Sequence, residues 1–399
     1  MKKILKPDFI LFAVITLALW IASAYVVHNF ISPDKSYSIL EHNYIDQHTR
    51  QALAWQAGRL DIGQTFSYLE LAIYKGKVYN SFPPVTTLIE FPLTLIFKEN
   101  TPNNLVMIIF IWLAMLFTFF ILEKLTGNRL LSYVFAFTFY WGSNIYYLSL
   151  AAPVWHQGHI YGLFFAVTAF LVLVYSRKAT SLIPGALCLG LAIGCRPFYF
   201  LFIPLYIYLA AGRYSLKNVL ICTVIGLLPP GLFIGILNYA RFGSPFNFGH
   251  VYLPFENKLA DGVFGFSYLP RNAFSAFLRL PMWDNYKKFI IFNGHGTSVF
   301  IISPVIFLGL YALVKRKVPF SDKTIVFLTL IAVWFLLLMH HGNGWFQFGY
   351  RYSVDIILLL VIFFGWSFKK LQWWMIPFCV YSVAANFYGA VWFYYLNNL

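Results

Sequence analysis

Two acidic side chains, Asp46 and Glu70, are the leading candidates for a catalytic base. Both lie in the polar segment of residues 32–82, which is far longer than a simple connection between two helices. A carboxylate presented in such a loop can accept the proton of an attacking hydroxyl group. The alternative is that both are ordinary solvated loop acids. Residue type alone leaves open which acid serves as the base.

A basic and aromatic run follows Glu70 and ends in two prolines. It reads Tyr74-Lys-Gly-Lys-Val-Tyr-Asn-Ser-Phe-Pro-Pro84 and contains Lys75, Lys77 and Tyr79. Ammonium groups bind phosphate oxygens as compact cations, so we predict that this run contributes to a phosphate or substrate site. Ordinary surface lysines are the alternative.

Two imidazoles, His156 and His159, are three residues apart and share one face if their segment is helical. Such a pair could bind a metal ion, but no acidic third ligand lies nearby in the sequence. We therefore favour substrate or phosphate contacts over a metal, with a plain interfacial Trp-His cluster as a further alternative. No cofactor is predicted, and a divalent metal ion stays open.

Arg196 and Arg351 are charged residues within or at the rim of apolar stretches. A charge at the centre of a spanning helix costs about 2.5–3.5 kcal/mol, so each must face a polar cavity or an anion. We expect the Arg196-Pro197 break to form the floor of a cavity, and both guanidinium groups to bind a phosphate or diphosphate. The alternatives are snorkelling of Arg196 to the headgroups and an ion pair between Arg351 and Asp355.

A second long segment, residues 240–296, has polar motifs at both ends. It opens with Asn238-Tyr-Ala-Arg-Phe-Gly-Ser-Pro-Phe246 and closes with Asn293-Gly-His-Gly-Thr-Ser298. Glycine and proline mark turns that fix a loop. We predict that Arg241 and His295 in these motifs bind substrate.

The elements that position these residues must be membrane helices. Apolar residues make up 60% of the 399 positions, charged residues 11%, and the mean hydropathy is +0.69. A soluble domain of this composition would expose large apolar patches. The net charge of +15 is scattered among apolar runs, which argues against nucleic-acid binding. The four cysteines also lie in apolar runs, so a disulfide framework is not expected.

About 20 apolar residues cross a bilayer, and the chain offers about ten or eleven such spans. The candidates are residues 9–31, 104–122, 130–150, 160–176, 218–239, 297–314, 324–340, 353–368 and 371–396, together with two short helices within 181–211. The prolines and Glu90 in residues 83–97 indicate a re-entrant or interfacial segment, and residues 44–60 suit an amphipathic helix on the membrane surface. We predict an all-α, polytopic helical bundle.

Charge asymmetry sets the orientation. With this arrangement the inner loops hold 15 of the 29 basic residues and three of the 14 acidic residues. Cytoplasmic loops are enriched in lysine and arginine, so the N-terminus is predicted inside and the C-terminus outside. All nine histidines then fall on or near the outer face, which predicts an extracytoplasmic site.

Taken together, these motifs resemble the polytopic GT-C glycosyltransferases, which use polyprenyl-phosphate sugars as donors. The similar features, in order, are the acidic first outer loop, Tyr74 to Pro84, Trp155-His-Gln-Gly-His159, Arg196-Pro197, Asn238 to Gly243 and Phe348-Gly-Tyr-Arg-Tyr352. The resemblance implies one membrane-embedded domain over 1–399, with extracytoplasmic loops at 32–82 and 240–296. It also implies that the acid of the first loop is the base and that basic residues hold the lipid phosphate.

The chain departs from the protein mannosyltransferase pattern, because its first loop has no adjacent Asp-Glu pair. It also lacks the large soluble C-terminal domain of oligosaccharyltransferases, which favours transfer of a single sugar. We expect a lipid, glycan or protein acceptor, and a bacterial inner membrane with the site facing outward. The alternatives are a transporter or flippase of an anionic lipid or solute, and a glycan ligase that uses polyprenyl-diphosphate donors.

Overall fold

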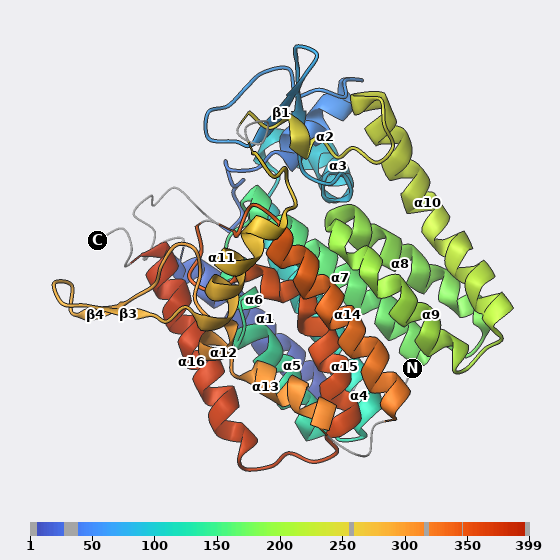
Figure 1. Ribbon diagram of the computed structural model, residues 1–399, viewed down its shortest axis with the longest axis vertical. Coiled ribbons are helices and arrows are strands. Elements are labelled where there is room, and N and C mark those ends of the chain that lie inside the picture. Colours follow the sequence, from blue (N-terminus) through green and yellow to red (C-terminus); the bar gives the residue numbers. More distant parts are fainter. Residues whose placement is uncertain (1–5, 28–38, 255–258, 315–318, 345, 396–399) are drawn as a thin grey trace.

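Six helices are long and apolar enough to cross a membrane in the computed structural model, which describes residues 6–27, 39–254, 259–314, 319–344 and 346–395. They are α1 (Pro7–Val26), α4 (Asn103–Thr126), α7 (Val154–Tyr175), α10 (Leu216–Phe242), α14 (Phe320–Met339) and α16 (Met375–Tyr394). Figure 1 shows α14 and α16 along the front of a helical bundle, with α10 leaning along one side. The prediction of a polytopic helical membrane protein is confirmed.

Shorter helices complete the bundle. They are α5 (Arg129–Trp141), α6 (Ile145–Leu148), α8 (Leu182–Cys195), α9 (Ile203–Ala211), α11 (Leu269–Ala273), α12 (Val299–Ile302), α13 (Val305–Leu310) and α15 (Ile357–Ser367). As expected, the stretch from 181 to 211 breaks at Arg196, where a 3-10 helix (Pro197–Phe202) leads into α9. The expected span 297–314 is instead interrupted between α12 and α13, because Pro304 has no N–H group to continue the first helix.

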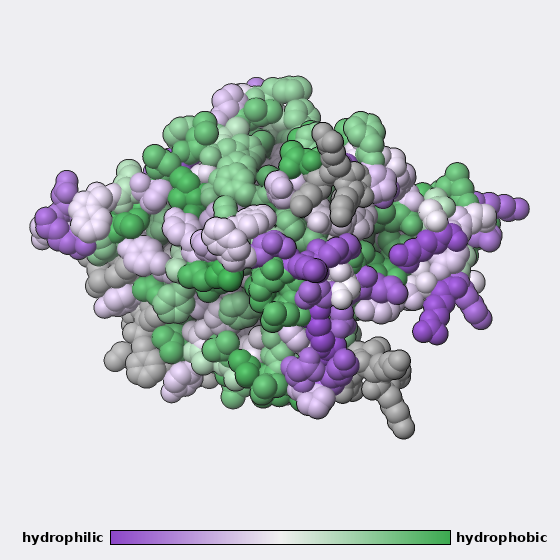
Figure 2. Space-filling model, turned by 90° about the horizontal axis from the view of Figure 1, so that it is seen from below, coloured by the Kyte–Doolittle hydropathy of each residue, from purple (hydrophilic) through white to green (hydrophobic). Residues whose placement is uncertain are grey.

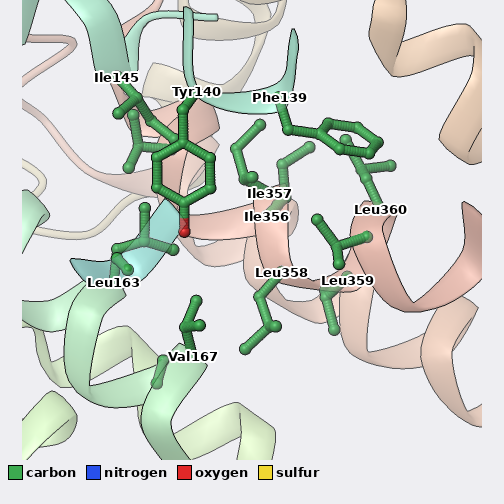
Figure 3. Packing of buried hydrophobic residues seen from close by; sticks show 14 of the residues in the cluster. Phe139, Tyr140, Ile145, Leu163, Val167, Ile356, Ile357, Leu358, Leu359 and Leu360 are labelled. Carbon is green, nitrogen blue, oxygen red and sulfur yellow. The ribbon is translucent and has the colours of Figure 1, made fainter. Parts of the chain in front are cut away.

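Helix α15 is part of the buried core, and Figure 3 shows its first residues close to Phe139, Tyr140, Leu163 and Val167. Every residue from Ile357 to Gly365 is buried, as expected for a helix that is hydrophobic on all sides. The ring of Phe364 stacks on Phe135 of α5 with centroids 3.9 Å apart. The hydroxyl of buried Tyr140 shares a 2.8 Å hydrogen bond with Thr118, so this polar group is satisfied inside the apolar core.

Residues 39–97 fold into a cap over one end of the bundle (Figure 1). It contains α2 (His48–Gln56) and an antiparallel hairpin of β1 (Leu71–Tyr74) and β2 (Lys77–Asn80), followed by α3 (Val85–Phe97). Lys75 and Gly76 form the two-residue turn with φ of 48° and 73°, the signature of a type I′ turn. A second hairpin, β3 (Met282–Asp284) with β4 (Phe289–Ile291), projects from the side of the molecule.

The loops predicted to face inward gather at the opposite end. Arg129 bonds Asp8 at 2.6 Å and Glu123 at 2.7 Å, which ties α5 to α1 and α4. Arg213 donates to the carbonyl groups of Leu173 and Val174 at the end of α7. Figure 2, the view of this lower end, shows hydrophilic residues in patches beside apolar surface. His28 and five of the predicted inner basic residues lie outside the described residues: Lys2, Lys3, Lys315, Arg316 and Lys317.

Candidate active site

A cavity of about 1000 Å³ lies between the cap and the helix ends. Its walls come from the first turns of α7, the end of α8, the 3-10 helix after Arg196, residues 244–251 and the segment that follows α14. Five of the nine histidines line it: His48, His159, His250, His340 and His341. Five of the nine histidines predicted to lie near the outer face therefore gather around a single cavity at one end of the bundle.

Glu70 is the predicted base candidate that borders this cavity. It directly precedes β1, and its main-chain oxygen accepts a 2.8 Å hydrogen bond from Ser81, which fixes the backbone there. Within the described part of the chain, no lysine, arginine or histidine nitrogen lies within ion-pair distance of its carboxylate. Glu70 is a half-buried residue of the cavity wall.

Asp46, the other base candidate, is fully buried and does not line the cavity. Its carboxylate accepts hydrogen bonds from the backbone N–H groups of His48 and Thr49 at 2.9 Å and from Gln157 Nε2 at 3.0 Å. Burial alone would raise the pKa of Asp46, but His48, His42 and the Thr49 hydrogen bonds together lower it below its usual value. Asp46 is thus an ionised side chain that joins the first turn of α2 to α7.

His48 reaches the cavity from the first turn of α2. Its Nδ1 lies 2.9 Å from Thr87 Oγ1 and 3.1 Å from the side-chain nitrogen of Asn80. Because an amide N–H can only donate, Nδ1 accepts, and the proton of the neutral ring is on Nε2. Burial lowers the pKa of His48 to about 4 despite the nearby charge of Asp46. Sequence reasoning did not single out this residue beyond its membership of the histidine group.

Arg196 also lines the cavity, and Asp355 is its ion-pair partner. Arg196 Nε donates to Asp355 Oδ1 at 3.3 Å, and the guanidinium lies 5.2 Å from the ring centroid of Tyr352. His159 Nδ1 is 3.4 Å from the same carboxylate. The alternative expectation of an ion pair between Arg351 and Asp355 is therefore wrong, because Asp355 faces Arg196 and His159.

Arg351 is buried at the cavity wall without a carboxylate partner in the described residues. Its backbone N–H donates to Gln347 Oε1 at 2.8 Å, which holds the start of the 3-10 helix Arg351–Ile356. The side-chain Nε atom is buried and has no hydrogen-bond partner among the described residues. Because buried charges are usually compensated, anion binding by Arg351 stays a prediction.

The remaining predicted site residues do not line this cavity. Lys75 is in the exposed hairpin turn, and Lys77 Nζ lies 4.0 Å from Asp61. The ring of Tyr79 packs on Phe242 with centroids 5.2 Å apart. These residues belong to the cap and to its contact with the end of α10.

Three further candidates are held by neighbouring groups outside the cavity lining. Arg241 donates to the carbonyl of Asn80 at 3.1 Å and to Asn238 Oδ1 at 2.7 Å, which ties α10 to the cap. His156 Nδ1 lies 3.1 Å from the carbonyl of Ala151, and its ring packs on Tyr147. His295 Nδ1 lies 2.9 Å from the side-chain nitrogen of Asn343.

No group of three histidine, cysteine or acidic side chains is placed to hold a metal ion within the described ranges. The pair His156 and His159 is split, because only His159 reaches the cavity. We therefore assign no metal ligands, and a role for a divalent metal stays a prediction.

No family model and no curated protein sequence matches the chain. Among solved structures it resembles the oligosaccharyltransferase of Archaeoglobus fulgidus in its apo form, with a TM-score of 0.52 and 13% identity over 95% of this chain and 55% of that chain. It also resembles the archaeal oligosaccharyltransferase AglB of that organism in complex with an inhibitory peptide and a dolichol-phosphate, with a TM-score of 0.51 and 11% identity over 98% and 56% of the two chains. The chain thus spans little more than half the length of these neighbours. The shared architecture shows that the chain has the membrane fold of these oligosaccharyltransferase structures.

Proposed function

We propose that this protein is a membrane glycosyltransferase that moves a single sugar from a polyprenyl-phosphate donor to a lipid, glycan or protein acceptor. The observation that carries the proposal is that one acidic and one basic residue, not bonded to each other, line the same cavity of a GT-C fold. Glu70 supplies a carboxylate and Arg351 a buried guanidinium without a carboxylate partner in the described residues. A base and an anion site at one cavity are the two groups that such a transfer needs.

Glu70 acts as the base in this proposal. It takes the proton of the acceptor hydroxyl as the acceptor oxygen attacks the anomeric carbon of the sugar. The bond between that carbon and the phosphate oxygen breaks, and the polyprenyl phosphate leaves with the bonding electron pair. Asp46 is less suited to this role, because it is buried and three N–H groups already occupy its carboxylate.

Arg351 stabilises the phosphate as negative charge develops on the leaving oxygen. A guanidinium offers a planar fork of donors that matches phosphate oxygens. Arg196 is less available for this role, because Asp355 already compensates its charge. His159 and the neutral His48 can add hydrogen bonds to the sugar or the acceptor.

The aromatic walls of the cavity suit the rest of the donor. Rings of this kind stack on sugar faces and pack on prenyl chains, because they offer large apolar surfaces. The aromatic residues that line the cavity are Phe82, Trp155, Phe198, Phe200, Phe246, Phe248, Phe264 and Tyr352. The dolichol-phosphate in the AglB complex is a polyprenyl phosphate of the proposed class. Because that complex also contains an inhibitory peptide, a peptide is one of the acceptors to be tested.

The proposal is tested with purified protein in lipid nanodiscs and chemically defined polyprenyl-phosphate sugars. Peptide, glycan and lipid acceptors are supplied separately, and products are identified by mass spectrometry. We expect the acceptor mass to increase by one sugar and the same amount of polyprenyl phosphate to be released. Transfer of a whole oligosaccharide from a diphosphate donor would indicate a ligase. Movement of the donor across the bilayer without product would indicate a flippase, and either result contradicts the proposal.

A further inference from the structure

A second cavity, of about 500 Å³, lies at the end of the bundle opposite the candidate active site. It is formed at the last turns of α7 and α15 and the first turn of α14, whereas the candidate active site is formed at the first turns of α7 and the last turn of α14. The positive-inside rule predicts that this end is cytoplasmic. The proposed transfer does not use this cavity.

Two opposite charges line this cavity without pairing with each other. Asp322, in the first turn of α14, is half-buried, and its Oδ1 accepts a 2.8 Å hydrogen bond from Tyr208. Arg213 Nη1 donates hydrogen bonds to the carbonyl groups of Leu173 and Val174. Within the described residues neither side chain has an ion-pair partner within 4.0 Å.

The remaining walls are largely apolar. Phe170 and Ile362 are buried at the cavity, and the half-buried Trp366 adds an indole ring. Trp is enriched where the hydrocarbon core meets the headgroups, and its face attracts ammonium groups. The cavity therefore combines an apolar interior with one acidic and one basic group at the membrane boundary.

We infer that this cavity binds one phospholipid whose headgroup carries a primary ammonium, of the phosphatidylethanolamine class. Arg213 contacts the lipid phosphate, and Asp322 accepts hydrogen bonds from the ammonium beside Trp366. A purely anionic headgroup would meet Asp322 as a like charge. A choline headgroup keeps the positive charge but has no N–H donor for the carboxylate. Charge and hydrogen bonding together therefore select the aminophospholipid.

Native mass spectrometry of the full-length purified protein tests this inference. Phosphatidylethanolamine, phosphatidylcholine and phosphatidylglycerol with identical acyl chains are titrated in turn. We expect one phosphatidylethanolamine per chain, bound about tenfold more tightly than the other two, as expected from one hydrogen bond to a charged group. Asp322→Asn should remove the preference for phosphatidylethanolamine. Arg213→Gln should weaken the binding of all three lipids by the same factor.

Glu99→Gln, an exposed acid that does not line this cavity, is the matched control and should leave the binding unchanged. Gel filtration and thermal unfolding confirm that each variant is folded. Tighter binding of phosphatidylglycerol, equal binding of the three lipids, or an unchanged preference in folded Asp322→Asn protein would overturn the inference. None of these results depends on sugar transfer, so the two proposals fail separately.

Discussion

Asp355 forms an ion pair with Arg196, although 159 positions separate the two residues in the sequence. The pair joins the break after α8 to the 3-10 helix before α15, and both segments border the candidate active site. The charge of Arg196 is compensated by this contact. Arg351 is therefore the arginine of the cavity lining that has no carboxylate partner among the described residues.

Removal of Asp355 should destabilise the protein more than removal of the whole pair. Asp355→Ala leaves Arg196 uncompensated, and we expect a loss of about 3 kcal/mol in the free energy of unfolding, the lower end of the range for broken buried pairs. The double variant Arg196→Met with Asp355→Leu should recover most of this loss. Chemical unfolding in detergent measures both variants. Equal destabilisation by the single and the double variant would contradict the ion-pair account.

Arg351→Gln should weaken donor binding. We expect kcat/KM for a polyprenyl-phosphate sugar to fall about tenfold, because a charged hydrogen-bonding partner of the phosphate is lost. Arg351→Lys should recover only part of the affinity, since an ammonium lacks the planar fork. Arg59→Gln is a matched control, because Arg59 is exposed and does not line the cavity. Unchanged kinetics in both Arg351 variants would remove Arg351 from the proposed donor site.

His48 should make the stability of the protein depend on pH. Its pKa is lowered from 6.5 to about 4 by burial, so the unfolded chain binds more protons below pH 6.5. The stabilisation is present above pH 6.5 and is lost as the pH falls towards 4. Between pH 7 and pH 5 we expect wild type to lose about 2 kcal/mol relative to His48→Gln. Unfolding curves of both proteins at the two pH values measure this difference, and parallel changes would contradict it.

Gly194 allows α3 to pack closely on α8. An added Cβ would lie 2.2 Å from Val85 Cγ2 and 2.8 Å from Ile234 Cδ1. We expect Gly194→Ala to cost about 1–3 kcal/mol and to displace the cap from the bundle. Gly231→Ala is the control, because this glycine of α10 has open space around its added Cβ. Gly231→Ala should be neutral or slightly stabilising, because alanine has a better helix propensity than glycine. Thermal unfolding of both variants and of the wild type measures the difference.

Much of the fold was predicted from hydropathy and from the free-energy cost of burying a charge in the membrane. They located all six long helices and the break at Arg196, and charge asymmetry predicted that the histidines lie on one side. The hairpin β1–β2 was missed, because Lys75-Gly76 is not one of the dipeptides, such as Asn-Gly or Asp-Gly, that signal a two-residue hairpin turn. The pairing of Asp355 with Arg196 could not be predicted, because it depends on which helices are neighbours rather than on local spacing.

The candidate site was only partly predictable for the same reason. Loop membership made Asp46 and Glu70 equivalent, but tertiary packing buries Asp46 against α7 and leaves Glu70 at the cavity wall. Likewise, His156 and His159 share a sequence motif, and only His159 borders the cavity. A helical face can be predicted from spacing, whereas what that face meets is decided by packing.

The initial rate of sugar transfer by Glu70→Gln and Asp46→Asn proteins, at saturating donor and acceptor, tests the central claim most directly. The amide oxygen introduced by Asp46→Asn can accept from His48 and Gln157, but the amide NH2 group then faces the Thr49 N–H. This protein should therefore be about 1–3 kcal/mol less stable, and the folded fraction should retain most of its kcat. Glu70→Gln should lower kcat by about 10²–10⁴-fold, the usual contribution of a general base. A large loss of kcat in Asp46→Asn together with near wild-type activity in Glu70→Gln would contradict the account.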